Sequence, residues 1–490
     1  MLDFNPDDVE IPNGHFIDGA LVGGGAERLT VRRPSDNQAY ADLSMADADL
    51  VDRAVTSAQR AFDATDWAKG APRDRARVLR RWADLIEADG QELGRLEALG
   101  STRPIVDFLA VDLPYAADCI RFFAEFADKL GGEVAATRSE QLGMVISEPY
   151  GVVAAISPWN FPVTQAVTKI SPALAAGNAV VLKPSEMTPF SALRLARLAL
   201  EAGMPAGIFN VLQGDGAVTG DALCRHPRIG KISFTGSTRT GAAIMATSAF
   251  NGLKPVTLEL GGKSPQLVFA DADLDKVARS VAGSIFGNAG QVCVAGSRLI
   301  VQRSVADALI ERVAALSRSL RPGPTWSGRT SFAPIVSIGQ LDRIDGIVRR
   351  TVAAGAEAVI GGRRLADIQD GAFYEPTILS GVSSDMEAVR EEIFGPVLTC
   401  QTFEDEAEGL SLAAHPLYGL AAGVHTADIS SALRAVRALK AGTVWVNRYG
   451  RTADYIIPTG GYGGSGIGKD LGRQAVEASL RHKSALIDFG

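Results

Sequence analysis

Three residues that together support acyl chemistry stand in separate segments of the 490-residue chain. Cys293 has small neighbours, and a thiolate is an intrinsically strong nucleophile. Glu259 ends an apolar run before two glycines, where a carboxylate either pairs with a cation or acts as a base. Asn160 lies in the loop Pro158–Pro162, and its amide could donate to an oxyanion or serve as an ordinary turn residue. Taken alone, a cysteine like Cys293 is typical of a buried apolar position.

Two further segments could bind a nucleotide. Gly236 and Ser237 follow a strand-like run and open a helix, and the N–H groups at a helix N-terminus bind anions such as a pyrophosphate. The same residues alone also fit an ordinary capped junction. Lys183 and Glu186 follow another apolar run at the presumed carboxyl edge of a sheet, where they could contact ribose hydroxyls or only cap the next helix.

Two glycine motifs are poor candidates for phosphate binding. Gly461–Gly466 fits GxGxxG, but it follows Pro458 rather than a strand and no βαβ unit comes after it. Gly262–Ser264 resembles the end of a phosphate-binding loop, yet Thr257 stands where that loop needs its first glycine.

Apolar periodicity predicts the elements that position these residues. Arg73–Leu99 has helical spacing, and helices such as Phe190–Ala202 and Thr240–Ala249 separate strand-like runs. The runs are Val152–Ile156, Ala179–Leu182, Gly207–Leu212, Ile232–Phe234, Val256–Leu260 and Gln266–Phe269. Continuous apolar strands between helices indicate a parallel sheet covered on both faces, so we predict a doubly wound α/β nucleotide-binding domain.

The alternation begins again after about residue 261. Helices are expected at Asp271–Phe286 and Val305–Leu320, and strands at Arg298–Val301, Ala358–Ile360 and Thr443–Val446. Ser484–Phe489 could be a strand without a partner nearby in the sequence, and such a terminal strand often pairs with another subunit.

Composition narrows the class of protein. The length favours two or three domains, and 46% apolar with 21% charged residues is a globular balance. A net charge of −7 argues against a nucleic-acid surface. The acidic N-terminus is not a secretory signal, and prolines interrupt the longest apolar stretch, Gly151–Thr168, so no membrane helix is expected. Four scattered cysteines and five histidines predict neither disulfides nor a metal site, and they suit a reducing cytoplasm.

Taken in order, these segments resemble the aldehyde dehydrogenase superfamily over nearly the whole chain. The resemblance extends to the branch that acts on amino- and γ-glutamylamino-aldehydes. The matching segments are Pro158–Pro162, Lys183–Glu186, Phe234–Ser237, Glu259–Pro265, Gly290–Cys293, Glu391–Pro396 and Gly442–Asn447.

The resemblance implies a mechanism. Cys293 would attack the aldehyde, and the Asn160 amide with the Cys293 N–H would hold the oxyanion. Glu259 would activate the water that hydrolyses the thioester, which favours a free acid over a CoA product.

The resemblance also implies NAD as cofactor. Lys183 and Glu186 would contact the adenine ribose, Gly236 and Ser237 the pyrophosphate, and Glu392 the nicotinamide ribose. Trp159 and Phe394 would complete the cofactor site. Because a carboxylate at position 186 repels a 2′-phosphate, NAD is favoured over NADP.

The implied architecture has three parts. Residues 1–130 and 150–260 would bind NAD, residues 261–470 would form the catalytic domain, and residues 131–149 with 471–490 would form an oligomerisation element. That element combines a β-hairpin with the last strand and predicts a homodimer or homotetramer.

The substrate pocket departs from relatives that act on small apolar aldehydes. Its expected residues are Tyr115, Phe161, Gln165, Thr168, Val292, Asp454 and Thr459. Thr164, Gln165, Thr168, Gly287 and Thr459 stand where bulky apolar or aromatic side chains are common, and the rim 448–455 is polar. Asp454 could meet a cationic end group or pair with Arg451.

These features favour a longer or polar aldehyde of the ω-amino, guanidino or γ-glutamylamino type. An aromatic or indole aldehyde remains open. So do two other functions: a catalytically silent structural member and a CoA-acylating enzyme.

Overall fold

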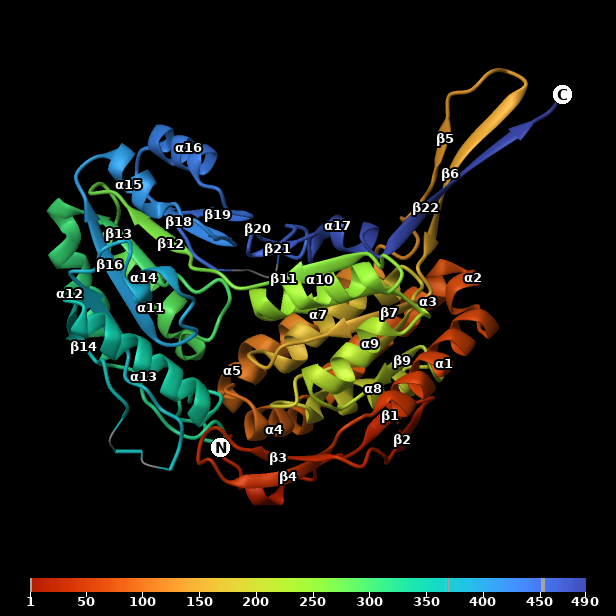
Figure 1. Ribbon diagram of the computed structural model, residues 1–490, viewed down its shortest axis with the longest axis horizontal. Helices are drawn as coiled ribbons and strands as arrows, with labels where there is room; N and C mark the ends of the chain where they lie inside the picture. The colour runs from red at the N-terminus through yellow and green to blue at the C-terminus, as the bar shows by residue number, and fades with distance from the viewer. Residues whose placement is uncertain (1, 366, 369, 451–453) are drawn as a thin grey trace.

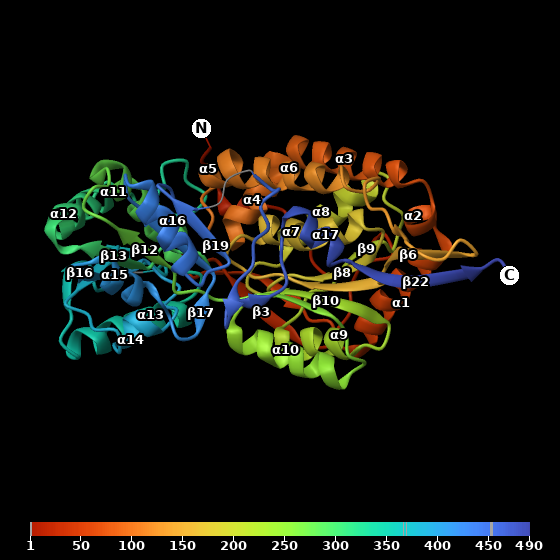
Figure 2. The same ribbon diagram turned by 90° about the horizontal axis from the view of Figure 1, so that it is seen from above.

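The computed structural model describes residues 2–365, 367, 368, 370–450 and 454–490. Two α/β lobes lie side by side, and a narrow β arm projects from one of them (Figures 1 and 2). Each lobe is built on its own sheet, as the two alternating stretches of the sequence predicted.

The first lobe is built on an eight-stranded sheet of order β2-β1-β9-β8-β7-β10-β11-β21. The five strands from β9 to β11 are parallel, while β1, β2 and β21 run antiparallel at the edges. The strands are β1 (His15–Ile17), β2 (Ala20–Val22), β7 (Val152–Ile156), β8 (Ala179–Lys183), β9 (Phe209–Val211), β10 (Ile229–Thr235), β11 (Val256–Glu259) and β21 (Gly466–Ile467). The predicted doubly wound α/β fold is therefore confirmed.

Helices cover both faces of this sheet. Helices α7 (Pro162–Ala175) and α8 (Phe190–Glu201) pack on one face, and α1 (Ala48–Ala64), α9 (Asp221–Arg225) and α10 (Thr238–Phe250) on the other (Figure 2). Beyond α7 and α8 lies an outer layer that contains α6 (Leu113–Ala124). The central strands are buried on both faces, which explains their continuous apolar sequences.

One predicted helix is wrong in its extent. Arg73–Leu99 forms two helices, α3 (Pro72–Ala88) and α4 (Gly90–Gly100), which meet at Asp89. Gly90 allows the close approach there, because a Cβ at this position would collide with Leu113. The apolar spacing continues through the break, so periodicity alone did not reveal it.

The second lobe is built on a seven-stranded sheet of order β14-β15-β16-β13-β12-β18-β19. Neighbouring strands in this sheet are parallel, except that β14 and β15 are antiparallel. The strands are β12 (Pro265–Val268), β13 (Arg298–Gln302), β14 (Glu357–Ile360), β15 (Thr377–Ser380), β16 (Val397–Phe403), β18 (Ala421–His425) and β19 (Thr443–Val446). Its helices include α11 (Leu274–Phe286), α12 (Ala306–Ser317) and α13 (Ile338–Ala353).

The projecting arm joins segments that are far apart in the sequence. β5 (Glu133–Ala135) and β6 (Gln141–Pro149) form a hairpin, and β22 (Leu480–Asp488) pairs antiparallel with β6 along its whole length. The last strand therefore has a partner in its own chain. Val134, Leu486 and Phe489 remain largely exposed on the arm, whose free end carries the C-terminus (Figure 1).

The start of α7 rests on a buried carboxyl group. Glu97 of α4 is 2% exposed, and its Oε1 accepts the N–H of Val163 at 3.0 Å. Burial raises the pKa of Glu97 to about 8, so this side chain is protonated near neutral pH. This contact fixes the first turn of α7 directly after Asn160 and Phe161.

The raised pKa predicts how stability depends on pH. An unperturbed glutamate ionises near pH 4.5, whereas Glu97 keeps its proton to about pH 8, so the native state binds more protons between these values. The contribution of Glu97 to the free energy of unfolding is therefore complete below about pH 4.5 and is lost as pH rises toward 8. Glu97→Gln keeps an acceptor for Val163 and cannot ionise. We expect it to melt within about 1 °C of wild type at pH 5 and several degrees above it at pH 9.

Thermal unfolding between pH 5 and pH 9 checks this expectation. Glu92→Gln, on an exposed position of the same helix, is the control and should track wild type throughout. Parallel melting curves for Glu97→Gln and wild type would contradict the assignment.

Candidate active site

Cys293 follows a tight turn between α11 and β13. Asn288, Ala289 and Gly290 are consecutive residues with positive φ, of 48°, 50° and 71°. A Cβ at Gly290 would collide with the Gly395 carbonyl, so only glycine fits this approach. Cys293 is half-buried, whereas Cys119, Cys224 and Cys400 are buried. Among the four cysteines it alone is placed to react.

The structure brings Asn160 to the loop that carries Cys293. The Asn160 side chain is 3% exposed, and its Nδ2 donates to the Gln291 carbonyl at 3.0 Å. An amide nitrogen carries two hydrogens, so this bond orients the group and leaves a second N–H for a ligand. Asn160 lies between β7 and α7 of the first lobe, and Gln291 belongs to the second.

Glu259 is the last residue of β11 and is 5% exposed. Gly262, three residues later, allows close packing, because a Cβ there would lie 2.7 Å from the Cys293 carbonyl. On the other side, a Cβ at Gly460 would lie 2.9 Å from Glu259 Oε1. The Glu259 carboxylate therefore lies against the segment around Gly460, and the chain that follows Glu259 reaches the Cys293 loop at Gly262.

A buried ion pair near this site was not predicted from the sequence. Lys169 Nζ of α7 lies 2.8 Å from Asp470 Oδ2, and both side chains are nearly inaccessible. Thr459 is tied to Asp470 by main-chain hydrogen bonds in both directions, and its hydroxyl donates to the Asp470 carbonyl at 3.1 Å. About 300 residues separate the charged partners, so no local sequence pattern could have paired them.

A groove of about 480 Å³ runs along the carboxyl edge of the first sheet. Among its lining residues are the predicted Trp159, Lys183, Glu186, Gly236 and Ser237. Its volume lies within the range usual for small-molecule sites.

Lys183 is held by main-chain carbonyls and by Glu186 at this edge. Its buried Nζ donates to the carbonyls of Pro184 at 2.8 Å and Gly214 at 2.6 Å, and it lies 3.3 Å from Glu186 Oε2. An ammonium group has three N–H donors, and these contacts use all of them. Lys183 therefore orients Glu186, and the expected contact to a ribose rests mainly on the partly exposed Glu186.

The middle of the groove is the N-terminus of α10. Ser237 is its N-cap, with the side chain accepting the Thr240 N–H at 3.2 Å. A Cβ at Gly236 would crowd Phe234, so glycine leaves the groove open there. Both the capping and the anion-binding interpretations of this segment fit, because a helix N-terminus presents more N–H groups than one cap satisfies.

The inner end of the groove leads to a second carboxyl group. The Trp159 ring packs edge-on against Phe394, with centroids 5.2 Å apart, and Phe394 has a φ of 55°. Glu392 Oε1 accepts the Gly262 N–H at 3.0 Å, and burial raises the pKa of Glu392 to about 7. Glu392 therefore lies beside Gly262, the residue that packs against the Cys293 carbonyl.

Aromatic rings contact their neighbours closely at two of the positions expected in the substrate pocket, Tyr115 and Phe161. The Tyr115 ring meets Tyr455 edge-on at 5.0 Å, and the Tyr455 hydroxyl donates to the Tyr115 carbonyl at 3.0 Å. Phe161 covers the Arg103 guanidinium at 4.6 Å, and Arg103 is paired with the buried Asp112. This ion pair fixes the guanidinium beneath Phe161, and it was missed because its members carry no distinctive motif.

Two of the threonines expected at the substrate pocket bond to main-chain carbonyls. Thr168 is 2% exposed and donates to the Thr164 carbonyl at 2.9 Å, and the Thr459 hydroxyl is engaged with Asp470. These hydroxyls therefore satisfy the backbone rather than a ligand. Gln165 and Val292 are partly exposed and Asp454 is exposed, while Arg451 lies outside the described residues.

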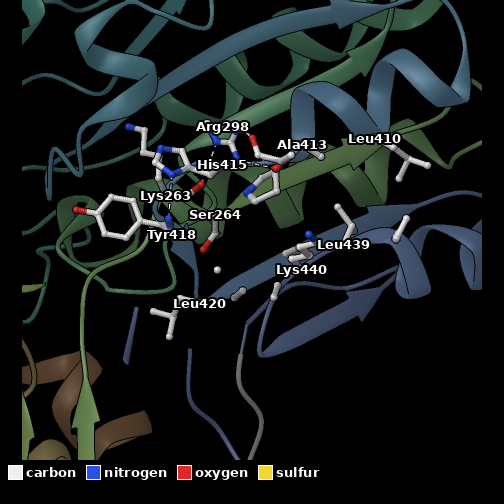
Figure 3. Close-up of a pocket in the computed structure, with 17 residues that line it drawn as sticks. Lys263, Ser264, Arg298, Leu410, Ala413, His415, Tyr418, Leu420, Leu439 and Lys440 are labelled. Atoms are coloured by element: carbon white, nitrogen blue, oxygen red, sulfur yellow. Dashed lines mark hydrogen bonds between the residues drawn. The ribbon is translucent and has the colours of Figure 1, made fainter. Parts of the chain in front are cut away.

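A separate cavity of about 230 Å³ lies behind the segment after Gly262 (Figure 3). The Arg298 guanidinium donates there to the carbonyls of Lys263 and Ala413, at 2.9 and 2.8 Å. Strand β12 begins directly after Ser264, so Gly262–Ser264 does not open the helix of a phosphate loop.

The arrangement combines a half-buried cysteine, an amide bonded to the same loop, a buried carboxylate and a groove of about 480 Å³. No cluster of histidine, cysteine and acidic side chains that could hold a metal ion occurs among the described residues. Within the same part of the chain, no helix is long and apolar enough to span a bilayer.

Comparison with known proteins identifies relatives of this arrangement. The family model described as "Aldehyde dehydrogenase family" matches residues 22–485. An indole-3-acetaldehyde dehydrogenase mutant from P. syringae, solved with NAD+ and IAA, is 42% identical with a TM-score of 0.96. The match covers 99% of this chain and 98% of that chain.

Two further solved structures are similar over almost their whole length. A γ-glutamyl-γ-aminobutyraldehyde dehydrogenase from Burkholderia cenocepacia is 44% identical with a TM-score of 0.95, covering 99% of this chain and 98% of that one. A betaine aldehyde dehydrogenase mutant from Staphylococcus aureus, solved with NAD+, is 35% identical with a TM-score of 0.94, covering 98% and 96%.

The exposure of the four cysteines predicts selective alkylation. Burial raises the pKa of Cys224 and of Cys400 to about 12, and Cys119 is fully buried, so these thiols should stay unreactive in the native protein. Iodoacetamide should add about one equivalent, on Cys293, as measured by intact and peptide mass spectrometry. Cys293→Ala should take up none, and Cys224→Ala should behave as wild type. Modification of a different cysteine first would refute this assignment.

Proposed function

The chain belongs to the aldehyde dehydrogenase family, and on that premise we propose that Cys293, Asn160 and Glu259 convert an aldehyde to its acid with NAD. The observation that carries this proposal is the meeting of three segments where the lobes join. The Asn160 amide is bonded to the Cys293 loop at Gln291, and Gly262, three residues after Glu259, packs against the Cys293 carbonyl.

The proposed reaction begins with attack of the Cys293 thiolate on the aldehyde carbon. A carbon–sulfur bond forms and the carbonyl oxygen becomes an oxyanion, which the Asn160 amide and the Cys293 N–H hold. Bound NAD supplies the oxidant that takes a hydride from the former aldehyde carbon. The product on the protein is then a thioester of Cys293.

Glu259 completes the cycle by accepting a proton from water. The resulting hydroxide adds to the thioester carbon, the carbon–sulfur bond breaks, and the Cys293 thiolate leaves with the free acid formed. Burial at the end of β11 shields this carboxylate from bulk solvent. A general base at this position supports hydrolysis rather than transfer to CoA.

The groove fits a dinucleotide. Glu186 offers acceptors for ribose hydroxyls at one end, the N-terminus of α10 suits a pyrophosphate, and Trp159 leads toward Glu392 and Phe394. A 2′-phosphate near Glu186 would meet a like charge, which costs about 4 kcal/mol at 4 Å with an effective dielectric near 20. We therefore propose NAD over NADP, as in the similar structures solved with NAD+.

We propose a longer, polar aldehyde of the ω-amino, guanidino or γ-glutamylamino type as substrate. The exposed Asp454 and the partly exposed Gln165 support a polar end group, and a similar protein carries the name γ-glutamyl-γ-aminobutyraldehyde dehydrogenase. The second candidate is an indole or other aromatic aldehyde. The rings of Tyr115, Tyr455 and Phe161 and the relative named for indole-3-acetaldehyde favour it.

The proposed assembly is a cytoplasmic homodimer or homotetramer. The arm of β5, β6 and β22 leaves apolar side chains exposed, which a second copy would bury. The proposed domains are residues 1–130 and 150–260 for NAD, 261–470 for catalysis, and 131–149 with 471–490 for assembly. β21, although within the proposed catalytic range, pairs with β11 of the first sheet.

An aldehyde panel tests the proposal. Reduced-cofactor absorbance should appear with NAD and an aldehyde, without CoA, and should be lost in Cys293→Ala. The kcat/KM for 4-aminobutyraldehyde or its γ-glutamyl amide should exceed that for hexanal by about 10-fold or more, because a polar end group is recognised. Indole-3-acetaldehyde, benzaldehyde and betaine aldehyde complete the panel.

Each outcome has a distinct meaning. A preference for the indole substrate selects the second candidate, and dependence on CoA indicates acyl transfer. No signal with any aldehyde, together with no effect of Cys293→Ala, would leave a catalytically silent member and refute the proposed function.

A further inference from the structure

A buried network of amides lies behind the nucleophile and is centred on Asn288. Its Nδ2 donates to the Asn160 carbonyl at 3.0 Å and lies 3.4 Å from the Gln291 carbonyl. Its Oδ1 accepts the Thr102 hydroxyl at 2.8 Å. Thr102 and Gln291 are fully buried, and Asn160 and Asn288 are 3% and 6% exposed. Every contact of this side chain is therefore shielded from water.

The network fixes the Gln291 carbonyl from two sides. Asn160 Nδ2 and Asn288 Nδ2 both point at this oxygen. The Gln291 side chain is also anchored, since its Nε2 donates to the Asn288 and Pro334 carbonyls at 3.0 and 2.9 Å. Because one N–H of Asn160 follows this oxygen, the direction of its second N–H is set by the same network.

The position requires an asparagine for both its backbone and its side chain. Asn288 has φ 48° and ψ 33°, a left-handed conformation that asparagine tolerates better than most residues. The side chain must also accept from Thr102 on one side and donate to two carbonyls on the other. An aspartate of the same shape could accept, but its ionised form has no hydrogen to donate and its protonated form has one in place of the amide's two.

Asn288 also bridges the two lobes. Its main chain belongs to the turn that precedes Cys293, while Thr102 and Asn160 come from the first lobe, at the end of α4 and before α7. Main-chain shifts at this turn would be transmitted to Gln291, two residues before the nucleophile. The same amide thus touches both segments that supply the proposed oxyanion donors.

We propose that Asn288 is a positioning residue that aims the Asn160 amide and the Cys293 N–H at one point. The inference rests on the proposed function of Asn160 and Cys293. Replacing the Asn288 side chain should slow the step in which charge develops on the carbonyl oxygen of the substrate. Affinity for NAD should change little, because Asn288 does not line the described groove. Alkylation of Cys293 should also persist, because Asn288 is buried and bonds to main-chain carbonyls and Thr102 rather than to the thiol.

Single-turnover kinetics with excess enzyme test this role. In Asn288→Asp, which keeps the acceptor for Thr102, the rate of NADH formation should fall by about 10- to 100-fold, somewhat less than the full loss of an oxyanion donor. The amplitude of NADH formation, divided by the amount of Cys293 that iodoacetamide can alkylate, should stay near that of wild type. A purely structural defect would instead lower the amplitude and leave the rate of the active fraction unchanged.

Thr102 supplies the matched pair of variants. Thr102→Val removes the hydroxyl that holds the Asn288 amide and should lower the rate in the same direction, by a smaller factor. Thr102→Ser retains the hydroxyl and should restore most of the rate. If Asn288→Asp does not fold, the comparison of Thr102→Val with Thr102→Ser decides whether Asn288 has the positioning role.

The inference and the proposed function fail in different ways. An active wild type with an unchanged single-turnover rate in Asn288→Asp, or equal rates in Thr102→Val and Thr102→Ser, would overturn the positioning role. A wild type that forms no NADH with any aldehyde would overturn the proposed function itself.

Discussion

The hydrogen bond from the Asn160 amide to the Gln291 carbonyl joins the two lobes where the reaction is proposed to occur. Each lobe contributes one partner, so neither sheet alone forms the site. The bond is buried, and leaving either polar group unpaired there would cost about 1–3 kcal/mol. Other contacts hold the two segments that form this bond. Glu97 anchors the start of α7, directly after Asn160, and Gly290 allows the turn before Gln291 to approach Gly395.

The sequence predicted the central strands well because each is buried on both faces and has a continuous apolar run. β7 is such a strand and has the predicted bounds. β19 also has the predicted bounds, although it is a partly buried edge strand of the second sheet. Short edge strands such as β1, β2 and β21 were not predicted, since two or three residues carry no periodicity. The break between α3 and α4 was missed because the apolar spacing continues across it. Proposed catalytic roles came from the order of the motifs, since no single motif was decisive.

The rest of the site depends on contacts between distant segments. Lys169 with Asp470, Arg103 beneath Phe161 and Thr102 with Asn288 bring together side chains with no local signature. Thr168 shows that residue type alone does not predict how polar the surface of a pocket is. Its hydroxyl donates to the Thr164 carbonyl, so it is not free to donate to a ligand.

The division of roles between Cys293 and Glu259 is the central claim, and trapping the acyl-enzyme tests it most directly. Glu259→Gln, mixed with NAD and an accepted aldehyde, should form about one equivalent of NADH and then stop. Mass spectrometry should find the acyl group on the Cys293 peptide, because the thioester forms but lacks the base that hydrolyses it. Turnover at the wild-type rate, or an NADH burst with no acyl group on Cys293, would contradict the account.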